Sequence, residues 1–323
     1  MLGKSFGVQL AEAFRYTSYL IRIPVQTSSR SYEVLVERGL LRHAAIELRE
    51  FIRSGAHIFA LTSPPIRKLY GGVLLKSFSE TGQKLVMLEM PDGERSKTLS
   101  QLERVAERMV AMRADRKSVL LALGGGVVGD VGAFLASTFM RGIPVVQLPT
   151  TLLAQVDSSI GGKTGVNLAS GKNLLGTFHQ PLAVLADPQV LSTLPDREYR
   201  SGLFESMKYG VISNPEIFEL MEANRDAFLR RDAGLLERLI AACIQVKADV
   251  VGADERENGV RRILNFGHTI GHALEAETNY KYFLHGEAVG WGMIAATLIG
   301  VGLQMTDKQT AQRIISLVFA YAP

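Results

Sequence analysis

A change of hydrophobic pattern near Leu194 constrains the fold of this chain more than any other feature of its sequence. Before that point, short β-branched and apolar runs alternate with helix-periodic segments. The strand-like runs are YEVLV, HIFALT, KLVMLEM, SVLLALG, PVVQLPT and LAVLAD. Such alternation predicts a parallel sheet with helices packed on its faces. After Leu194 the periodic segments, such as LLERLIAACIQVKADVVGAD, are all helical, so an all-helical part follows.

The length of the chain, 323 residues, is enough for two domains. We expect an N-terminal extension over residues 1–22, an α/β domain over 23–193 and a helical domain over 194–323. Pro195 interrupts the pattern at the seam between the last two. A cleft between two such domains is the usual place for a ligand.

The composition is that of a globular protein, with 47% hydrophobic and 21% charged residues. The net charge is only +4, and no run of lysine and arginine is interleaved with aromatic residues, which argues against nucleic-acid binding. No apolar run is long enough to cross a bilayer. The single cysteine, Cys243, cannot form an intrachain disulfide, which indicates a reducing compartment such as the cytoplasm.

Three of the six histidines, His268, His272 and His285, fall within one short stretch. The first two are four residues apart and therefore share one face of a helix. Imidazoles in this arrangement favour a divalent metal, and a third histidine after a short turn completes such a site. The alternative is two ordinary helical histidines and one on the surface.

A glycine turn, Gly124 to Gly126, joins the strand SVLLAL to the helical segment VGAFLASTFM. Glycines between a strand and a helix N-terminus allow backbone N–H groups to approach a phosphate, although the spacing is not G-x-G-x-x-G. A plain tight turn is the alternative. Glu94 and Lys97, on a loop after another strand, suit ribose hydroxyls or phosphate, but a solvated turn has the same composition.

The segment TTLLAQVDSSIGGKTGVNLASGKNLLGTFHQP is predicted to be a long functional loop. It places Asp157, Lys163, Asn167, Lys172 and Asn173 close together in the sequence. Two lysines flanked by glycines suit an anionic, hydroxylated substrate. An ordinary Ω-loop is the alternative.

Longer motifs carry a family resemblance. They are GGGVVGD, MRGIPVVQLPTTLLAQVDSSIGGKTGVN, GKNLLGTFHQP, FESMKYG, KADVVGADERENGVRRILNFGHTIGHALE and HGEAVGWGM, and the similarity spans Arg30 to about Leu303. With these motifs the chain resembles the 3-dehydroquinate synthases of the sugar phosphate cyclase family. The resemblance implies an α/β N-terminal domain with a Rossmann-like parallel sheet, followed by an all-α C-terminal domain.

The implied reaction converts 3-deoxy-D-arabino-heptulosonate 7-phosphate, a small phosphorylated sugar acid, to 3-dehydroquinate and phosphate. The implied cofactors are NAD+ and Zn2+, with Co2+ as a possible replacement, in a cytoplasmic homodimer that binds neither nucleic acid nor membrane. By the same resemblance, Glu205, His268 and His285 bind the metal, His272 is a polar or acid/base group, and Asp157 lies at the reacting end. Arg141 matches an arginine that reaches the partner subunit's site.

Two further sets of residues follow from the resemblance. The positions implied to contact substrate are Lys163, Asn173, Lys208, Lys247, Arg261 and Asn265. The positions implied on the NAD side are Glu94, Lys97, Gly124, Gly125, Gly126, Asp130, Thr150, Thr151 and Lys172.

Departures from the family pattern leave rival interpretations open. Thr62 and Ser63 stand where many members carry Asp or Asn, and we expect members to continue for several dozen residues past the final LVFAYAP, including a lysine that lines the site. The rivals are another sugar phosphate cyclase, a metal-dependent polyol dehydrogenase of related architecture, and a truncated remnant without activity. The intact Arg261, Asn265 and His272 argue for the synthase over the other cyclases.

Overall fold

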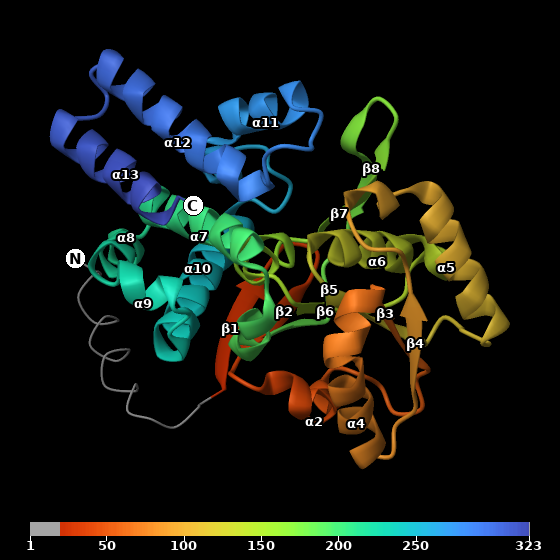
Figure 1. Ribbon diagram of the computed structural model, residues 1–323. Coiled ribbons are helices and arrows are strands. Elements are labelled where there is room, and N and C mark those ends of the chain that lie inside the picture. Colours follow the sequence, from red (N-terminus) through yellow and green to blue (C-terminus); the bar gives the residue numbers. More distant parts are fainter. Residues whose placement is uncertain (1–19, 323) are drawn as a thin grey trace.

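A seven-stranded sheet forms the centre of the first part of the molecule (Figure 1). The computed structural model describes residues 20–322. The strands lie in the order β1-β2-β9-β6-β5-β3-β4; β1 pairs antiparallel with β2, and the other pairs are parallel. Their bounds are β1 (Ile21–Gln26), β2 (Ser31–Val36), β3 (Ile58–Thr62), β4 (Leu85–Glu89), β5 (Val119–Gly124), β6 (Val145–Pro149) and β9 (Ala183–Ala186). The predicted parallel sheet is confirmed.

Burial explains why the inner strands are apolar along their whole length. Every residue of β3, β5, β6 and β9 is buried, as expected for parallel strands covered by helices on both faces. The edge strand β1 instead alternates between buried and exposed positions. It begins at Ile21, so the last residues of the predicted extension 1–22 belong to the sheet. The rest of that extension, residues 1–19, lies outside the described residues.

Helices connect the strands. The longer ones are α4 (Gly72–Glu80), α5 (Leu99–Ala111) and α6 (Gly126–Thr138), and the short ones are α2 (Ala44–Glu47) and α3 (Pro64–Ile66). Short 3-10 or π-helical segments are η1 (Leu40–Arg42), η2 (Leu48–Glu50), η3 (Arg67–Gly71), η4 (Glu94–Ser96), η5 (Phe139–Arg141), η6 (Ala154–Ser158), η7 (Pro188–Thr193) and η8 (Val260–Asn265). The helical pattern LRHAAIELREFI is therefore broken into three short pieces instead of one helix.

The segment predicted as a long loop contains a β-hairpin. Strands β7 (Lys163–Leu168) and β8 (Gly171–Phe178) pair antiparallel with each other and with no strand of the large sheet. In Figure 1 the hairpin stands out on the same side of the molecule as α11 and α12. Most residues of β8 are exposed, so its sequence lacks the alternation of apolar and polar residues that would predict a half-buried strand.

The second part is helical, as predicted. Its helices are α7 (Asp196–Ile212), α8 (Pro215–Ala223), α9 (Arg225–Leu229), α10 (Ala233–Ala253), α11 (His268–Glu277), α12 (His285–Gly302) and α13 (Lys308–Tyr321). Pro195 is the N-cap residue of α7, so the change from strands to helices falls at the predicted seam. Leu203 of α7 nevertheless shares a core with Leu148 and Leu185 of the sheet, and the division into domains stays a prediction. Among the described helices, none is long and apolar enough to cross a membrane.

Candidate active site

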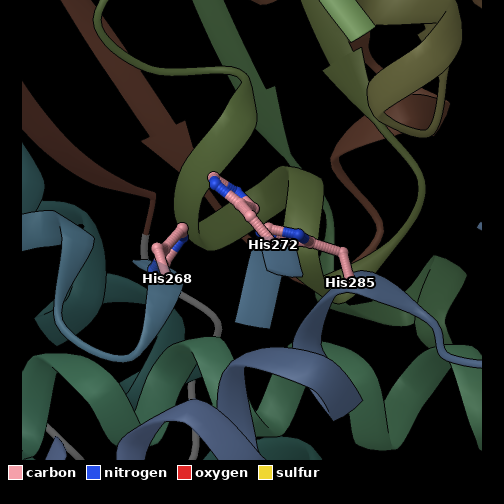
Figure 2. Close-up of side chains that lie close together, drawn as sticks. All are labelled: His268, His272 and His285. Carbon is pink, nitrogen blue, oxygen red and sulfur yellow. The ribbon is translucent and has the colours of Figure 1, made fainter. Parts of the chain in front are cut away.

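The three histidines come together at the N-terminal ends of two helices. His268 is the first residue of α11 and His285 the first of α12, and His272 follows one turn after His268. One nitrogen of each ring lies within 4.8 Å of the others. Figure 2 shows the three rings gathered on one side of these helices.

Two glycines of α12 permit the close approach that places His268 and His285 together. A Cβ on Gly292 would lie 1.8 Å from the carbonyl oxygen of Gly267, the residue before His268. A Cβ on Gly286 would lie 1.9 Å from the carbonyl oxygen of Ser201 in α7. The backbone of α12 therefore packs directly against α11 and α7, which no larger residue allows at these positions.

A buried carboxylate from α7 faces two of the histidines. Glu205 is 1% exposed, and its Oε1 lies 3.6 Å from Nε2 of His268 and 3.5 Å from Nε2 of His285. The other oxygen, Oε2, accepts a hydrogen bond of 2.6 Å from Nζ of Lys208. Among the described residues, Oε1 finds no hydrogen-bond partner although it is buried. A buried acceptor without a partner is costly unless a ligand satisfies it.

Hydrogen bonds at Nδ1 orient two of the rings. His268 donates to the carbonyl oxygen of Phe266 at 3.2 Å, and His285 donates to Oε2 of Glu275 at 3.0 Å. In its neutral form each ring then presents the lone pair of Nε2 towards Glu205. Within residues 20–322, His272 makes no such bond, and it is exposed.

This donor set fits a divalent metal. Two imidazole nitrogens and one carboxylate oxygen suit Zn2+, which takes such ligands at about 2.0–2.2 Å and leaves a position open in catalytic sites. Burial lowers the pKa of His268 to about 4, so the ring is neutral near pH 7 and able to bind a metal. The three histidines alone are a second possible set. The orphaned oxygen of Glu205 and the two oriented rings favour Glu205, His268 and His285.

Glu205 also belongs to a network of charged side chains, together with Lys208, Lys247 and Asp157. Oδ1 of Asp157 lies 2.7 Å from Nζ of Lys247 and 3.8 Å from Nζ of Lys208, and it also accepts a bond from the hydroxyl of Tyr209. Burial raises the pKa of Asp157, but the ammonium groups of Lys247 and Lys208 outweigh this and hold it well below its usual value. Asp157 is therefore ionised in the folded chain.

The remaining residues implied to contact substrate are held by protein groups. Lys163 and Asn265 both donate to the carboxylate of Glu257, the latter at 2.9 Å. Arg261 is 1% exposed, and its guanidinium donates to the carbonyl oxygens of Glu255 and, at 3.2 Å, of Gly161. In this structure the guanidinium of Arg261 is thus buried and bonded to backbone carbonyl oxygens, and it does not line an open groove.

An open groove of about 1020 Å³ lies beside this group. Glu257 and Asn265 line it, together with the apolar side chains of Phe178 and Phe266. A groove of this volume is in the range of small-molecule sites.

Except for Lys172, which lies in hairpin strand β8, the residues implied on the NAD side lie at or just after the carboxyl ends of the parallel strands. Lys97 is 3% exposed and donates hydrogen bonds to both Asp130 and Asn173. Asn173, which the resemblance implies for substrate, therefore lies beside residues implied for NAD. Glu94 accepts a bond of 2.7 Å from Asn167. The carboxyl edge of a parallel sheet is the usual ligand site of such folds.

Three buried hydroxyl groups at this edge have no hydrogen-bond partner within residues 20–322. They belong to Thr62 and Ser63, at the end of β3, and to Thr150, directly after β6. Strand β5, which ends at Gly124, lies between those two strands. Unsatisfied hydroxyls on both sides of the glycine turn fit a hydroxylated, phosphorylated ligand such as a dinucleotide.

Packing also requires the glycines of this turn. A Cβ on Gly124 would lie 2.6 Å from Cβ of Val128, and one on Gly125 would lie 2.9 Å from Cγ2 of Thr151. Helix α6 begins at Gly126, so its N-terminus faces the same edge. The tight turn and the phosphate site are compatible explanations of the same residues.

Arg141 stands apart from these clusters. It follows α6 in a turn where both Met140 (φ 49°) and Arg141 (φ 72°) have left-handed backbone conformations. Its side chain is exposed and, within residues 20–322, makes no hydrogen bond or ion pair.

Three residues of the site were not identified from the sequence. Glu275 lies seven residues after His268 and so two turns further along the same helical face, which is a signal that the spacing contains. Tyr209 similarly lies one turn after Glu205. Glu257 lies in a loop, and nothing in its local sequence predicts that it accepts bonds from both Lys163 and Asn265.

Comparison with known proteins gives the same assignment along the chain. Residues 87–201 match the family model for the 3-dehydroquinate synthase N-terminal part, and residues 202–322 match that for the C-terminal part. A 3-dehydroquinate synthase of Koribacter versatilis is 61% identical over 302 residues, which is 94% of this chain and 82% of that protein. One from Nostoc sp. is 45% identical, covering 92% of this chain and 82% of that protein.

Solved structures extend the comparison. 2-Deoxy-scyllo-inosose synthase, in complex with carbaglucose-6-phosphate, NAD+ and Co2+, has a TM-score of 0.85 at 28% identity, over 94% of this chain and 81% of that chain. The 2-epi-5-epi-valiolone synthase ValA of Streptomyces hygroscopicus, with NAD+ and Zn2+ bound, has a TM-score of 0.83 at 27% identity, over 95% of this chain and 83% of that chain.

A glycerol dehydrogenase of Schizosaccharomyces pombe shares the fold, with a TM-score of 0.70 at 15% identity, over 95% of this chain and 78% of that chain. Its likeness concerns the fold alone. The two matching family models together cover most of the chain, and several 3-dehydroquinate synthases match at 45% identity or more. The chain belongs to the 3-dehydroquinate synthase family.

Proposed function

We propose that this chain converts 3-deoxy-D-arabino-heptulosonate 7-phosphate to 3-dehydroquinate and phosphate, as a phosphate-eliminating cyclase of the shikimate pathway. Family membership over most of the chain carries the proposal. The convergence of Glu205, His268 and His285 supports it, because the motif residues meet in space although α7 lies far from α11 and α12 in sequence.

The cofactors are NAD+ and a divalent metal, Zn2+ or Co2+. Glu205, His268 and His285 hold the metal. The glycine turn Gly124–Gly126, with the unpaired hydroxyls around it, receives the dinucleotide. A bound NAD+ would supply reversible hydride transfer, and a bound metal would supply polarisation of a substrate oxygen. The further nucleotide contacts come from Glu94, Lys97, Asp130, Thr150, Thr151 and Lys172.

The protein's own groups bind and orient an anion. Lys208 is fixed by Glu205 and Lys247 by Asp157, so both present positive charge without rearrangement. The remaining substrate contacts come from Lys163, Asn173, Arg261 and Asn265. Asp157 stays ionised at the reacting end. His272 is exposed, with its ring centroid 5.3 Å from that of His268, so it is placed to exchange a proton with a substrate atom near the metal.

The enzyme works as a cytoplasmic homodimer. The unpaired, exposed side chain of Arg141 supports a dimer in which this arginine completes the partner's site. The single, buried Cys243 supports a reducing compartment, because no disulfide within the chain is needed.

One assay tests the reaction. Phosphate release from 3-deoxy-D-arabino-heptulosonate 7-phosphate should require both NAD+ and a divalent metal, and a chelator should abolish it. A sugar phosphate without the carboxylate, such as glucose 6-phosphate, is the control and should give little phosphate. Preferential turnover of that control would assign the chain to another cyclase reaction, and oxidation of glycerol without phosphate release would assign it to the polyol dehydrogenases.

A further inference from the structure

Glu275 is a buried carboxylate between two of the clusters described above. It lies on α11 and is 4% exposed. Its two oxygens have different partners: Oε2 lies 3.0 Å from Nδ1 of His285, and Oε1 lies 3.3 Å from Nζ of Lys172. One side chain therefore joins a metal ligand to a lysine on the nucleotide side.

The contact with His285 determines which ring nitrogen is available. An imidazole whose Nδ1–H donates to a carboxylate is held with its lone pair on Nε2, and the carboxylate increases the strength of that nitrogen as a ligand. Nε2 of His285 lies 3.5 Å from Oε1 of Glu205, where the metal is expected. His268 is oriented by a backbone carbonyl instead, so His285 is the ligand whose orientation depends on a side chain.

The contact with Lys172 joins the hairpin to the helical part. Lys172 lies in β8, and its Nζ is 3.9 Å from the centre of the Tyr280 ring as well as near Glu275. Tyr280 lies in the turn after α11, in a left-handed conformation (φ 55°). The hairpin thus contacts the end of α11 through one lysine held by a carboxylate and an aromatic face.

We infer that Glu275 is a positioning residue: it orients His285 towards the metal and, through its second oxygen, holds Lys172 and the hairpin against α11. The inference rests on the proposed function for the metal ligands and for the nucleotide side. Its consequence is that metal binding and NAD+ binding are coupled through this carboxylate, since ordering Glu275 for one ligand also orders its contact with the other.

Zinc affinity tests the first part of the inference, that Glu275 orients His285 towards the metal. It is measured without substrate, by competition with a chromogenic chelator, in the parent chain and in Glu275→Leu, Glu275→Gln and Glu277→Gln. We expect Glu275→Leu to weaken zinc binding about 10–100-fold, as loss of an outer-sphere partner does. Glu275→Gln keeps an oxygen that accepts the Nδ1–H and should lose less. Glu277, exposed on the same helix, is the matched control and should leave the affinity unchanged.

NAD+ affinity with and without zinc tests the second part of the inference, that Glu275 couples metal binding to NAD+ binding. In the parent chain, the NAD+ affinity measured with zinc should differ from that measured without zinc. In Glu275→Leu the ratio of these two affinities should move towards one. Lys172→Met should give the opposite order of effects, weakening NAD+ binding more than zinc binding. The absorption of the Co2+-loaded chain should change in Glu275→Leu, because the geometry around His285 changes.

The outcomes separate this inference from the proposed function. A parent chain that binds neither zinc nor NAD+ contradicts the proposed function and the inference with it. A parent that binds zinc while Glu275→Leu and Glu275→Gln bind it equally tightly overturns the inference alone. Should Glu275→Leu fail to fold by circular dichroism, Glu275→Gln decides: zinc affinity equal to that of the parent rejects the positioning role.

Discussion

Lys208, Lys247 and Glu205 are buried beside the histidines, Asp157 is half-buried there, and the four charges cancel. Lys208 and Lys247 neutralise Glu205 and Asp157, which leaves the network without net charge before a metal binds. Removing one member of a buried ion pair costs about 3–5 kcal/mol, because its partner is left as an isolated charge. The site therefore requires the whole group, and substitutions within it affect stability as well as binding.

Glu205→Gln should separate the two possible ligand sets. The amide keeps the shape of the side chain but loses the charge that attracts a cation. We expect zinc affinity, measured by titration calorimetry, to fall by more than the roughly 10–100-fold that an outer-sphere change costs. His272→Ala should change it much less, because the proposed ligand set does not include His272. The reverse pattern, with His272→Ala abolishing binding, would show that the three histidines form the site.

Glu255 should make stability depend on pH in the acid range. Ser28, Ser29 and Gln180 donate to its carboxylate, and although burial raises its pKa, these bonds lower it from 4.5 to about 2. The unfolded chain thus takes up this proton first as the pH falls. The stabilisation is complete above pH 4.5 and is lost as the pH falls towards 2.

Glu255→Gln should lower the free energy of unfolding by about 1.5–3 kcal/mol at pH 7, the range for a bond to a charged group. The difference from the parent should shrink below about pH 4.5. Urea denaturation at a series of pH values measures it, with Glu277→Gln as an exposed control. A difference that stays constant down to pH 3 would contradict the low pKa of Glu255.

At the level of single residues, the sequence predicted side chains that share a helix or follow a known motif. His268 and His272 are close through helical spacing alone. Glu205 was predicted only through the family resemblance, because its contact with them depends on the packing of α7 against α12. Glu257 depends on a loop conformation, with φ 61° at that residue, which local sequence does not determine.

Among the elements, the buried strands were predictable and the hairpin was not. Strand β5 is apolar along its length because both of its faces are covered. Strand β8 is exposed at most positions, and its pairing with β7 is non-local, so neither burial nor periodicity marks it. Strand β1 contains Pro24, which weakens the strand pattern in sequence but is tolerated at a sheet edge.

The packing of α12 against α11 should control the metal site. Gly292→Ala places a Cβ where the carbonyl oxygen of Gly267 lies, so the helices must separate. We expect a loss of about 1–3 kcal/mol in the free energy of unfolding, together with weaker zinc binding. Gly302→Ala, on the same helix with no atom within 4 Å of its Cβ, should gain at most about 1 kcal/mol. Equal zinc affinity in the two variants would show that this contact does not position the histidines.

For the whole molecule, the apolar core continues from the sheet into the helices. The proposed metal ligands come from α7, α11 and α12, so this site would exist only when the helical part is folded. Zinc should therefore stabilise the whole chain. At about 100 times its dissociation constant, zinc adds roughly 2.7 kcal/mol, which for a chain of this length corresponds to about 4 °C in melting temperature. Differential scanning calorimetry with zinc and with chelator measures this shift, and Glu205→Gln should not show it.

Assembly of the dimer leads to the last prediction, which concerns Arg141. If this arginine completes the partner's site, Arg141→Ala and Glu205→Gln should each be inactive alone, yet regain activity when the two variants are refolded together. A mixed dimer then has one complete site, built from Glu205 of one subunit and Arg141 of the other. Random assembly of equal amounts makes half of the dimers mixed, so about one quarter of the parental activity should return. An arginine that acts within its own subunit gives no recovery, because each site then lacks one of the two residues. Phosphate release from the refolded mixture, compared with each variant refolded alone, distinguishes these two arrangements.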